Sequence, residues 1–331
     1  MKRSIEIKIY NGYGHSKNLV VYGHVFKWRP KLSGKYDKNS LRHAWSLLKL
    51  FMSRPYKKAN LKLFFKGQVI NTQADHDGFF KFKWASDVHL EAGLHDLRIG
   101  LVDFSGEVSH FTRGKVYVPH STQYVFVSDI DDTILISHSA TIWKRLKELL
   151  ARNPYKRKIF ANQVHWYNHL SLSGTDPEHL NPFFYVSSSE WNLYDYLREI
   201  FDYNLLPTGS FLLSHFKQWY DFFKTGRTKH EDKYRRIDRL LRVFPKQKFV
   251  LIGDNSQRDP IIYTVLANHY PDRVVAIYIR NVKPRKASIS HQLFNNLTNK
   301  DIYTCLFNSN QDAFAHSVET GLIRIKRTEV N

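Results

Sequence analysis

The sequence predicts an all-β, sandwich-like domain over residues 1–120, followed by an α/β domain with a parallel sheet over residues 121–331. Two observations support this division. Short strand-like segments separated by turn residues fill the first part, whereas continuous apolar strands alternate with helical segments in the second. Pro119 marks a plausible boundary between the two. The chain has 331 residues, 42% of them hydrophobic, which is enough to form two cores.

The N-terminal part shows strand periodicity from its start. Ile5, Ile7 and Ile9 alternate with Glu6 and Lys8, a pattern typical of a half-buried strand. We expect a turn at residues 11–14, where the sequence reads Asn-Gly-Tyr-Gly. Further short strands are expected at 19–22, 25–26, 61–65, 68–70, 79–84 and 97–102. This spacing predicts an antiparallel sandwich.

A basic helical insertion interrupts the β pattern near residues 38–53. Its apolar residues follow helical spacing and are Leu41, Ala44, Trp45, Leu48 and Met52. The surrounding segment 27–66 is dense in lysine and arginine and contains one acid, Asp37. Three interpretations stay open: a helix packed on the domain with a solvated basic face, an interfacial helix on a membrane surface, or a nucleic-acid contact.

Composition restricts the compartment and the partners. The formal net charge of +20 favours polyanionic partners such as anionic lipid surfaces, nucleic acid or phosphorylated substrates. The single cysteine, Cys305, excludes an internal disulfide framework and a cysteine-rich zinc site. No apolar run reaches the length of a membrane span, and residues 1–9 do not resemble a signal peptide. We therefore expect a cytoplasmic protein without a transmembrane segment, able to bind membranes peripherally.

The strand that begins near residue 124 organises the second domain. A short apolar run is followed directly by Asp129, Asp131, Asp132 and Thr133. Carboxylates are costly to bury unless they are paired or bind a cation, and ligands of parallel α/β sheets lie beyond the carboxyl ends of the strands. An acidic turn, a metal-binding pair of aspartates and a reaction centre are all compatible with this pattern.

Other elements of the second domain also end in polar residues. An apolar strand at 182–189 ends in serines that include Ser187, and a strand from 248 ends in Gly253-Asp254, with Asp259 five residues further on. Lys233 lies near the start of a helix expected at 230–244. The remaining expected elements are helices at 141–151, 160–172, 191–201 and 312–318 and strands at 206–213 and 274–279.

These motifs carry a resemblance to a known family. Residues 128–134, Ser-Asp-Ile-Asp-Asp-Thr-Ile, resemble the first motif of the haloacid dehalogenase superfamily and are similar to the actin-patch phosphatidate phosphatase family and its bacterial two-domain relatives. Ser187, Lys233 and the Asp254–Asp259 pair fall where the later superfamily motifs stand. The resemblance implies a haloacid dehalogenase-like (Rossmannoid) catalytic domain.

The resemblance also implies roles for these residues. Asp129 is expected to be the nucleophile that forms an aspartyl-phosphate, and Asp131 the general acid and base. Thr133 would order the nucleophile loop, while Ser187 and Lys233 would hold phosphoryl oxygens. The expected cofactor is Mg²⁺. Its ligands would be the carboxylates of Asp129, Asp254 and Asp259 and the backbone carbonyl of Asp131.

The sequence thus predicts a Mg²⁺-dependent phosphatidate phosphatase that produces diacylglycerol at an anionic membrane surface. One alternative is a phosphatase of another phosphomonoester, either a soluble metabolite or a nucleic-acid end. A second alternative is a basic protein that binds membranes or nucleic acid and carries a vestigial phosphatase fold. All four motifs are intact, which favours an enzyme.

Overall fold

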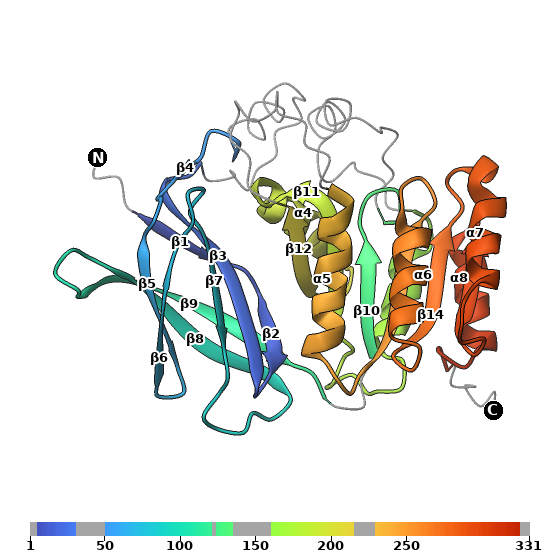
Figure 1. The fold of residues 1–331 in the computed structure, drawn as a ribbon, viewed down its shortest axis with the longest axis horizontal. Helices are drawn as coiled ribbons and strands as arrows, with labels where there is room; N and C mark the ends of the chain where they lie inside the picture. Colours follow the sequence, from blue (N-terminus) through green and yellow to red (C-terminus); the bar gives the residue numbers. More distant parts are fainter. Residues whose placement is uncertain (1–4, 31–49, 121–123, 135–159, 215–228, 325–331) are drawn as a thin grey trace.

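A computed structural model of the chain describes residues 5–30, 50–120, 124–134, 160–214 and 229–324. These residues form two sheets that lie beside each other, one composed of strands alone and one covered by helices (Figure 1). The helix expected at 141–151 and most of the basic insertion expected near 38–53 fall outside the described residues. None of the described helices is long and apolar enough to cross a membrane.

The first sheet has nine strands and follows the order β1-β3-β2-β9-β8-β5-β6, with β4 and β7 also paired to β3. The strands are β1 (Glu6–Ile9), β2 (Gly12–His15), β3 (Asn18–Trp28), β4 (Arg54–Pro55), β5 (Asn60–Phe65), β6 (Gln68–Gln73), β7 (Phe79–Trp84), β8 (Gly93–Val102) and β9 (Val108–Val118). All pairs are antiparallel except β2 and β9, which run parallel. The expected antiparallel sandwich is therefore a single mixed sheet.

The expected turn at residues 11–14 is wrong, because residues 12–15 form β2. The chain reverses at Ser16 and Lys17, and β2 then pairs with β3 on one side and β9 on the other. The glycines allow neighbouring strands to lie close together here, because a Cβ atom on Gly12 would lie 2.8 Å from the carbonyl oxygen of Val20. The tyrosine between them, Tyr13, is buried against Phe184 of the second sheet.

The first sheet curls around its own apolar core. Leu19, Val21 and Val25 of β3 point into this core together with Leu61 and Leu63 of β5. At the open side β6 lies next to β7, where the Thr72 hydroxyl donates to the Lys81 carbonyl at 3.3 Å. The curl buries one face of the sheet, as a sandwich would, without requiring a second sheet.

The second sheet has six parallel strands in the order β12-β11-β10-β13-β14-β15, which confirms the predicted parallel α/β architecture. Its strands are β10 (Tyr124–Asp129), β11 (Phe183–Glu190), β12 (Gly209–Ser214), β13 (Lys248–Asp254), β14 (Val274–Arg280) and β15 (Tyr303–Phe307). Helices α3 (Gln163–Ser171), α4 (Tyr194–Tyr203) and α8 (Asn310–Glu319) pack on one face, and α5 (Lys229–Val243), α6 (Asp259–His269) and α7 (Ala287–Asn295) pack on the other.

Burial on both faces explains the continuous apolar run of β10. Phe126 packs into the core under α3 and α4, while Val125 and Val127 pack into the core under α5 and α6. Each fully buried side chain of this kind contributes about 1.5–3 kcal/mol relative to an exposed one. The apolar pattern ends at the carboxyl end of the strand, where Asp129 and Asp131 begin the functional loop.

After β14, the sequence pattern predicted helix α8 but neither helix α7 nor strand β15. Helix α8 starts with a capping box formed by Ser309 and Asp312 and ends before Gly321, whose φ of 71° is the left-handed conformation that glycine favours. This confirms the helix expected at 312–318. Strand β15 and helix α7 were not expected, because both are short and only partly buried.

The two sheets share a core. Tyr10 stacks on Trp191 with ring centroids 4.1 Å apart, and both side chains belong to the same apolar cluster as Phe26. Lys8 forms an ion pair with Asp195 at 2.7 Å, and Arg29 pairs with the same carboxylate. Strand β9 ends at Val118 and β10 begins at Tyr124, so the boundary expected at residue 120 falls between these two strands.

Candidate active site

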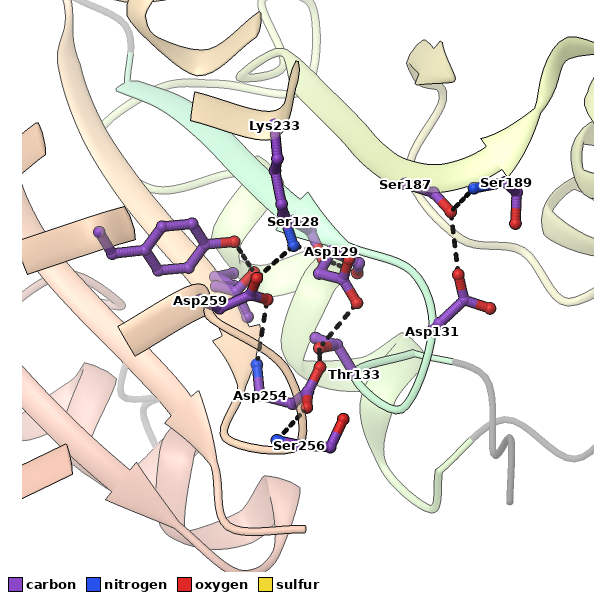
Figure 2. Close-up of polar contacts among 12 residues, drawn as sticks. Ser128, Asp129, Asp131, Thr133, Ser187, Ser189, Lys233, Asp254, Ser256 and Asp259 are labelled. Carbon is purple, nitrogen blue, oxygen red and sulfur yellow. Dashed lines mark hydrogen bonds and ion pairs between the residues drawn. The ribbon is translucent and has the colours of Figure 1, made fainter. Parts of the chain in front are cut away.

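Three buried carboxylates meet at the carboxyl end of the parallel sheet (Figure 2). Asp129 ends β10, Asp254 ends β13 and Asp259 begins α6. A carboxylate oxygen of each lies within 4.8 Å of the others, and none of the three side chains is more than 2% exposed. Because β10 and β13 are adjacent parallel strands, their carboxyl ends place the two aspartates next to each other.

Lys233 reaches this cluster from α5. Its ammonium lies 2.8 Å from Asp129 Oδ1 and 2.5 Å from Asp259 Oδ1. Burial alone would lower the pKa of Lys233, but the charges of Asp129 and then Asp259 outweigh burial and raise this pKa above its usual value. Lys233 therefore stays charged and balances part of the negative charge of the cluster.

Two of these carboxylates, Asp129 and Asp254, hold protons more tightly than ordinary aspartates. Burial raises the pKa of Asp129 well above its usual range, and the charges of Asp259 and Asp254 add to this effect while Lys233 opposes it. Burial, followed by the charge of Asp259, raises the pKa of Asp254 to about 7. Three carboxylates crowded around one ammonium leave an excess of negative charge in a site that excludes water.

This donor set fits a hard divalent cation. Mg²⁺ prefers oxygen ligands and is usually held by a few carboxylates. Within the described part of the chain, Asp129, Asp254 and Asp259 form the one group of three acidic, histidine or cysteine side chains found at this spacing. The excess negative charge that Lys233 leaves uncompensated is what such a cation would neutralise.

Asp131 and Ser187 form a second polar contact beside the cluster. The Ser187 hydroxyl donates to Asp131 Oδ2 at 2.9 Å and accepts from the Ser189 amide at 2.9 Å. Although an extended segment would point Asp129 and Asp131 the same way, their carboxylates contact different partners (Figure 2). The strand ends at Asp129, and Asp132 has a φ of 59°, so the chain turns at this point. Whether the Asp131 carbonyl is a metal ligand stays a prediction.

Thr133 lies between the two strand-end aspartates. Its hydroxyl is 3.5 Å from both Asp129 Oδ2 and Asp254 Oδ2. The structure thus gathers Asp129, Thr133, Lys233, Asp254 and Asp259 into one group. The Asp131–Ser187 pair adjoins this group through the same loop.

Gly253 allows Asp259 to approach the strand end. A Cβ atom at this position would lie 2.4 Å from Asp259 Oδ2 and 2.8 Å from Cε2 of Tyr263. Real Cβ atoms do not tolerate such distances, so any larger residue would displace the carboxylate. The Asp254 amide lies 3.4 Å from the same Oδ2 atom, and the Ser256 amide lies 2.5 Å from Asp254 Oδ1.

Two arginines that support the site were not singled out from the sequence. Arg280 ends β14, is 3% exposed, and donates to the Thr133 carbonyl at 3.3 Å and to Gln163 Oε1 at 2.9 Å. Arg236 donates to the carbonyls of Ser187 at 2.9 Å and Leu212 at 2.7 Å. Two sequence signals could have indicated them. Arg280 is a charged residue at the end of an apolar strand, and Arg236 is a second cation one turn after Lys233.

Comparison with known proteins places this site in a matched segment. Residues 124–281 match the family described as phosphatidate phosphatase APP1, catalytic domain. Phosphatidate phosphatase APP1 of Saccharomyces cerevisiae is 32% identical over 165 residues, which cover 46% of this chain and 25% of the yeast protein. An uncharacterised protein of Schizosaccharomyces pombe is 26% identical over 159 residues, covering 47% of this chain and 25% of that protein. The chain thus spans about a quarter of the length of these two relatives.

Solved structures are similar only at a low level. A carbohydrate acetylesterase of Xanthomonas citri matches 88% of this chain and 73% of its own, with 10% identity and a TM-score of 0.27. The β-glucuronidase 3 of Bacteroides uniformis matches 89% of this chain and 38% of its own, with 9% identity and a TM-score of 0.26. Scores of this size support no conclusion about fold or function.

The family match covers β10 to β14 and includes every one of the predicted site residues. It confirms the resemblance that the motifs indicated. Residues 124–281 of this chain are thus similar to the phosphatidate phosphatase APP1 catalytic domain, both by the family match and by the yeast relative.

Proposed function

We propose that the chain is a phosphoric monoester hydrolase of the haloacid dehalogenase type and that its substrate is phosphatidate. The observation that carries the proposal is the buried contact of Asp129 with Lys233, with Asp254 and Asp259 beside them, inside the segment that matches the family. The printed name of the yeast relative supports the substrate. The residues themselves support hydrolysis of a phosphomonoester.

In the proposed first step a carboxylate oxygen of Asp129 attacks phosphorus. Oδ1 accepts from Lys233, so Oδ2, which faces the Thr133 hydroxyl, is the better placed nucleophile. The new bond joins Oδ2 to phosphorus, and the bond from phosphorus to the ester oxygen breaks. A covalent intermediate divides one difficult displacement into two easier steps.

Asp131 is proposed to carry the proton in both steps. It would protonate the departing alkoxide and then remove a proton from the water that hydrolyses the aspartyl-phosphate. Ser187 holds Oδ2 of Asp131 at 2.9 Å, which fixes the carboxyl beside the nucleophile loop. The same hydroxyl and the Lys233 ammonium would hold phosphoryl oxygens, since positioning and charge stabilisation dominate phosphoryl transfer.

Asp129, Asp254 and Asp259 would hold Mg²⁺, together with the backbone carbonyl of Asp131. When bound, the cation offsets the repulsion between the Asp129 carboxylate and the phosphate dianion and stabilises the charge of the transition state. Lys233 contributes a fixed positive charge, with its ammonium 2.8 Å from Asp129 Oδ1. Lys233 alone leaves the three carboxylates with an excess of negative charge, so the site would accept a phosphate ester only when that excess is neutralised.

The basic segment 27–66 is proposed to dock the enzyme on an anionic membrane. Among its described residues, Trp28 is 38% exposed, Met52 is 46% exposed, and the ammonium of Lys27 lies 5.1 Å from the ring centroid of Tyr56. Exposed apolar side chains next to cations suit the interface of a bilayer. Each lysine or arginine near an anionic leaflet contributes about 1 kcal/mol.

The test is phosphate release from a substrate panel with and without Mg²⁺. The panel contains phosphatidate vesicles, sugar phosphates and nucleotides. We expect Mg²⁺-dependent release with a clear preference for phosphatidate. Preference for a soluble ester would contradict phosphatidate as the substrate but would agree with the proposed reaction. No release from any member of the panel would contradict the proposed function.

A further inference from the structure

A cleft lined by several charged side chains lies between the two sheets. It has a volume of about 530 Å³, and its walls come from β2, β3 and β7 on one side and from β12 and α5 on the other. Its described lining carries more positive than negative charge: the basic side chains are Lys81, Lys83, Arg235, Arg236, Arg239 and Arg242, and the acidic ones are Asp77 and Asp232. Figure 1 shows α5 at the border between the two sheets.

The cleft and the carboxylate cluster use different faces of α5. Lys233, Ile237 and Leu240 follow the helical repeat of the face that packs on the parallel sheet. Arg236 and Arg239 follow the same repeat on the neighbouring face, which lines the cleft. Lys233, Asp129, Asp254 and Asp259 are all absent from the described lining, and Arg236 lies between the cleft and the Ser187 carbonyl.

Several buried polar atoms in this cleft have no hydrogen-bond partner among the described residues. They are Nη2 of Arg236, Nε and Nη2 of Arg239, Oγ of Ser214 and Oδ1 of Asn18. Unpaired buried donors are costly, and native proteins rarely keep several of them together without a ligand or water. Four of these five atoms can donate, which suits a ligand rich in acceptor oxygens.

The charges around the cleft point to the same kind of ligand. Burial, and then the positive charges of Arg239 and Lys83, lower the pKa of Lys81. Burial also lowers the pKa of Arg236 to about 10. Neighbouring cations contribute to the shift of Lys81, whereas the shift of Arg236 comes from burial and is opposed by Asp232 and Asp129; a bound anion would raise both pKa values.

We propose that this cleft binds a small phosphorylated molecule through Arg236 and Arg239. Guanidinium groups bind phosphate oxygens with paired, charge-assisted hydrogen bonds, and here Nη2 of Arg236 and Nε and Nη2 of Arg239 are already buried without a partner among the described residues. The rings of Tyr22 and Phe79, stacked 5.9 Å apart in the wall, offer an apolar surface to the rest of the ligand. The site does not depend on the proposed hydrolysis, because it uses none of the carboxylates.

The test uses inorganic pyrophosphate as the probe and calorimetric titration in excess EDTA, which keeps metal ions from the carboxylate cluster. We expect one site in the full chain. Arg239→Gln should weaken binding by about tenfold or more, because it removes charged donors. Arg198→Gln is the matched control, since Arg198 lies on α4, outside the described lining, and pairs with Asp202 on the surface. Arg236 is left unchanged because it also holds the Ser187 carbonyl.

A second arm separates a soluble ligand from a lipid headgroup. Phosphatidate vesicles are compared with neutral phosphatidylcholine vesicles in a flotation assay. Vesicle binding that is lost in Arg239→Gln and kept in Arg198→Gln, without pyrophosphate binding, would assign the phosphate to a lipid headgroup and support the site.

Folding of the variants is checked by thermal melting without ligand. Arg239→Gln should melt close to the unmodified chain, because Nε and Nη2 of Arg239 have no hydrogen-bond partner among the described residues and the side chain loses only its contact with the Tyr13 hydroxyl. If it does not fold, Lys81→Gln on the opposite wall replaces it in both arms. The proposal is overturned if neither probe binds, if the cleft variant binds as tightly as the unmodified chain, or if Arg198→Gln weakens binding equally.

Discussion

At the scale of single residues, the site is defined by how four charged side chains share one buried space. Asp129, Asp254 and Asp259 are almost completely buried, and Lys233 contacts two of them. Such an arrangement is unfavourable for the folded chain by itself, because carboxylates that cannot be solvated repel one another. We therefore expect the site to lower stability and to contribute activity.

Asp254 gives this expectation a pH dependence. Its pKa is about 7 in the folded chain and 3.8 in the reference state, so the folded chain keeps a proton that the unfolded chain has lost between these values. The contribution of Asp254 to stability is therefore full below about pH 4, declines as pH rises to 7 and is absent above. In EDTA at pH 8, Asp254→Asn should raise the melting temperature by several degrees and abolish the activity with Mg²⁺.

The control for this variant is Asp202→Asn, which changes an exposed acid on α4. It should leave both the melting temperature and the activity unchanged. An Asp254→Asn protein that melts below the unmodified chain at pH 8 would contradict the unfavourable burial of this carboxylate.

The sequence predicted these acidic residues because polar groups after a buried strand are a local signal. It could not predict that Asp131 contacts Ser187 instead of the cluster, since that depends on the turn at Asp132. Nor did it identify Arg280, whose partners Thr133 and Gln163 are 147 and 117 residues away in the sequence. Such contacts follow from the fold and leave no local pattern.

At the scale of elements, the connection from β13 to α6 places two of the three carboxylates. Asp254 ends the strand and Asp259 begins the helix. The Asp259 carboxylate packs directly against Gly253 of the strand. The parallel strands β10, β11 and β13 were predictable because each is a continuous apolar run. We predicted a turn in place of β2 because glycines occur both at chain reversals and where strands pack closely. A single sequence does not distinguish these two cases.

Gly253→Ala tests this connection. The new Cβ would overlap Asp259 Oδ2 and the Tyr263 ring, so we expect a stability loss of about 1–3 kcal/mol. Displacement of the Asp259 carboxylate should lower kcat/KM by about a hundredfold or more, since small misplacements of this kind have large effects on rate. Urea unfolding and phosphate release measure the two effects.

Gly67→Ala is the matched control for this variant. Gly67 has a φ of 86° and open space around it, so the change costs backbone strain far from the site. It should lower stability while leaving kcat/KM unchanged. Equal activity in the two variants would mean that Gly253 does not position Asp259.

At the scale of the whole molecule, we expect the two sheets to fold as one unit. The Tyr10–Trp191 stack and the shared apolar cluster join β1 and β3 to the helical side of the parallel sheet. Interfaces of this apolar kind usually couple the unfolding of their two sides. We expect a single cooperative transition when the chain is unfolded by urea.

Tyr10→Ala should destabilise both sheets together. Tyr10 is 2% exposed and packs between Trp191 and Tyr194, so truncation should cost about 2–4 kcal/mol. Tyr203→Ala, which removes a ring that is 58% exposed, should cost less than about 0.5 kcal/mol. Two separate transitions in the Tyr10→Ala protein would show that the sheets unfold independently.

The strong positive charge also acts at this scale. If the basic segment docks the chain on anionic vesicles, phosphatidate hydrolysis should fall as salt rises from about 0.05 to about 0.5 M, because the Debye length shrinks several-fold. Replacing exposed Arg54, Lys57 and Lys58 by glutamine should act in the same direction. Hydrolysis of a small soluble phosphomonoester should change much less, and an equal loss on both substrates would assign these residues to the fold.

The central claim is that Asp129 attacks phosphorus, and trapping the intermediate tests it most directly. The full chain is mixed with substrate and Mg²⁺, quenched in acid within the first turnovers, and digested for mass spectrometry. We predict a phosphoryl group on the peptide that contains Asp129, and we predict that Asp129→Asn keeps the fold but shows neither this adduct nor turnover. Phosphate release by Asp129→Asn at the rate of the unmodified chain, or an adduct on another residue, would contradict the account.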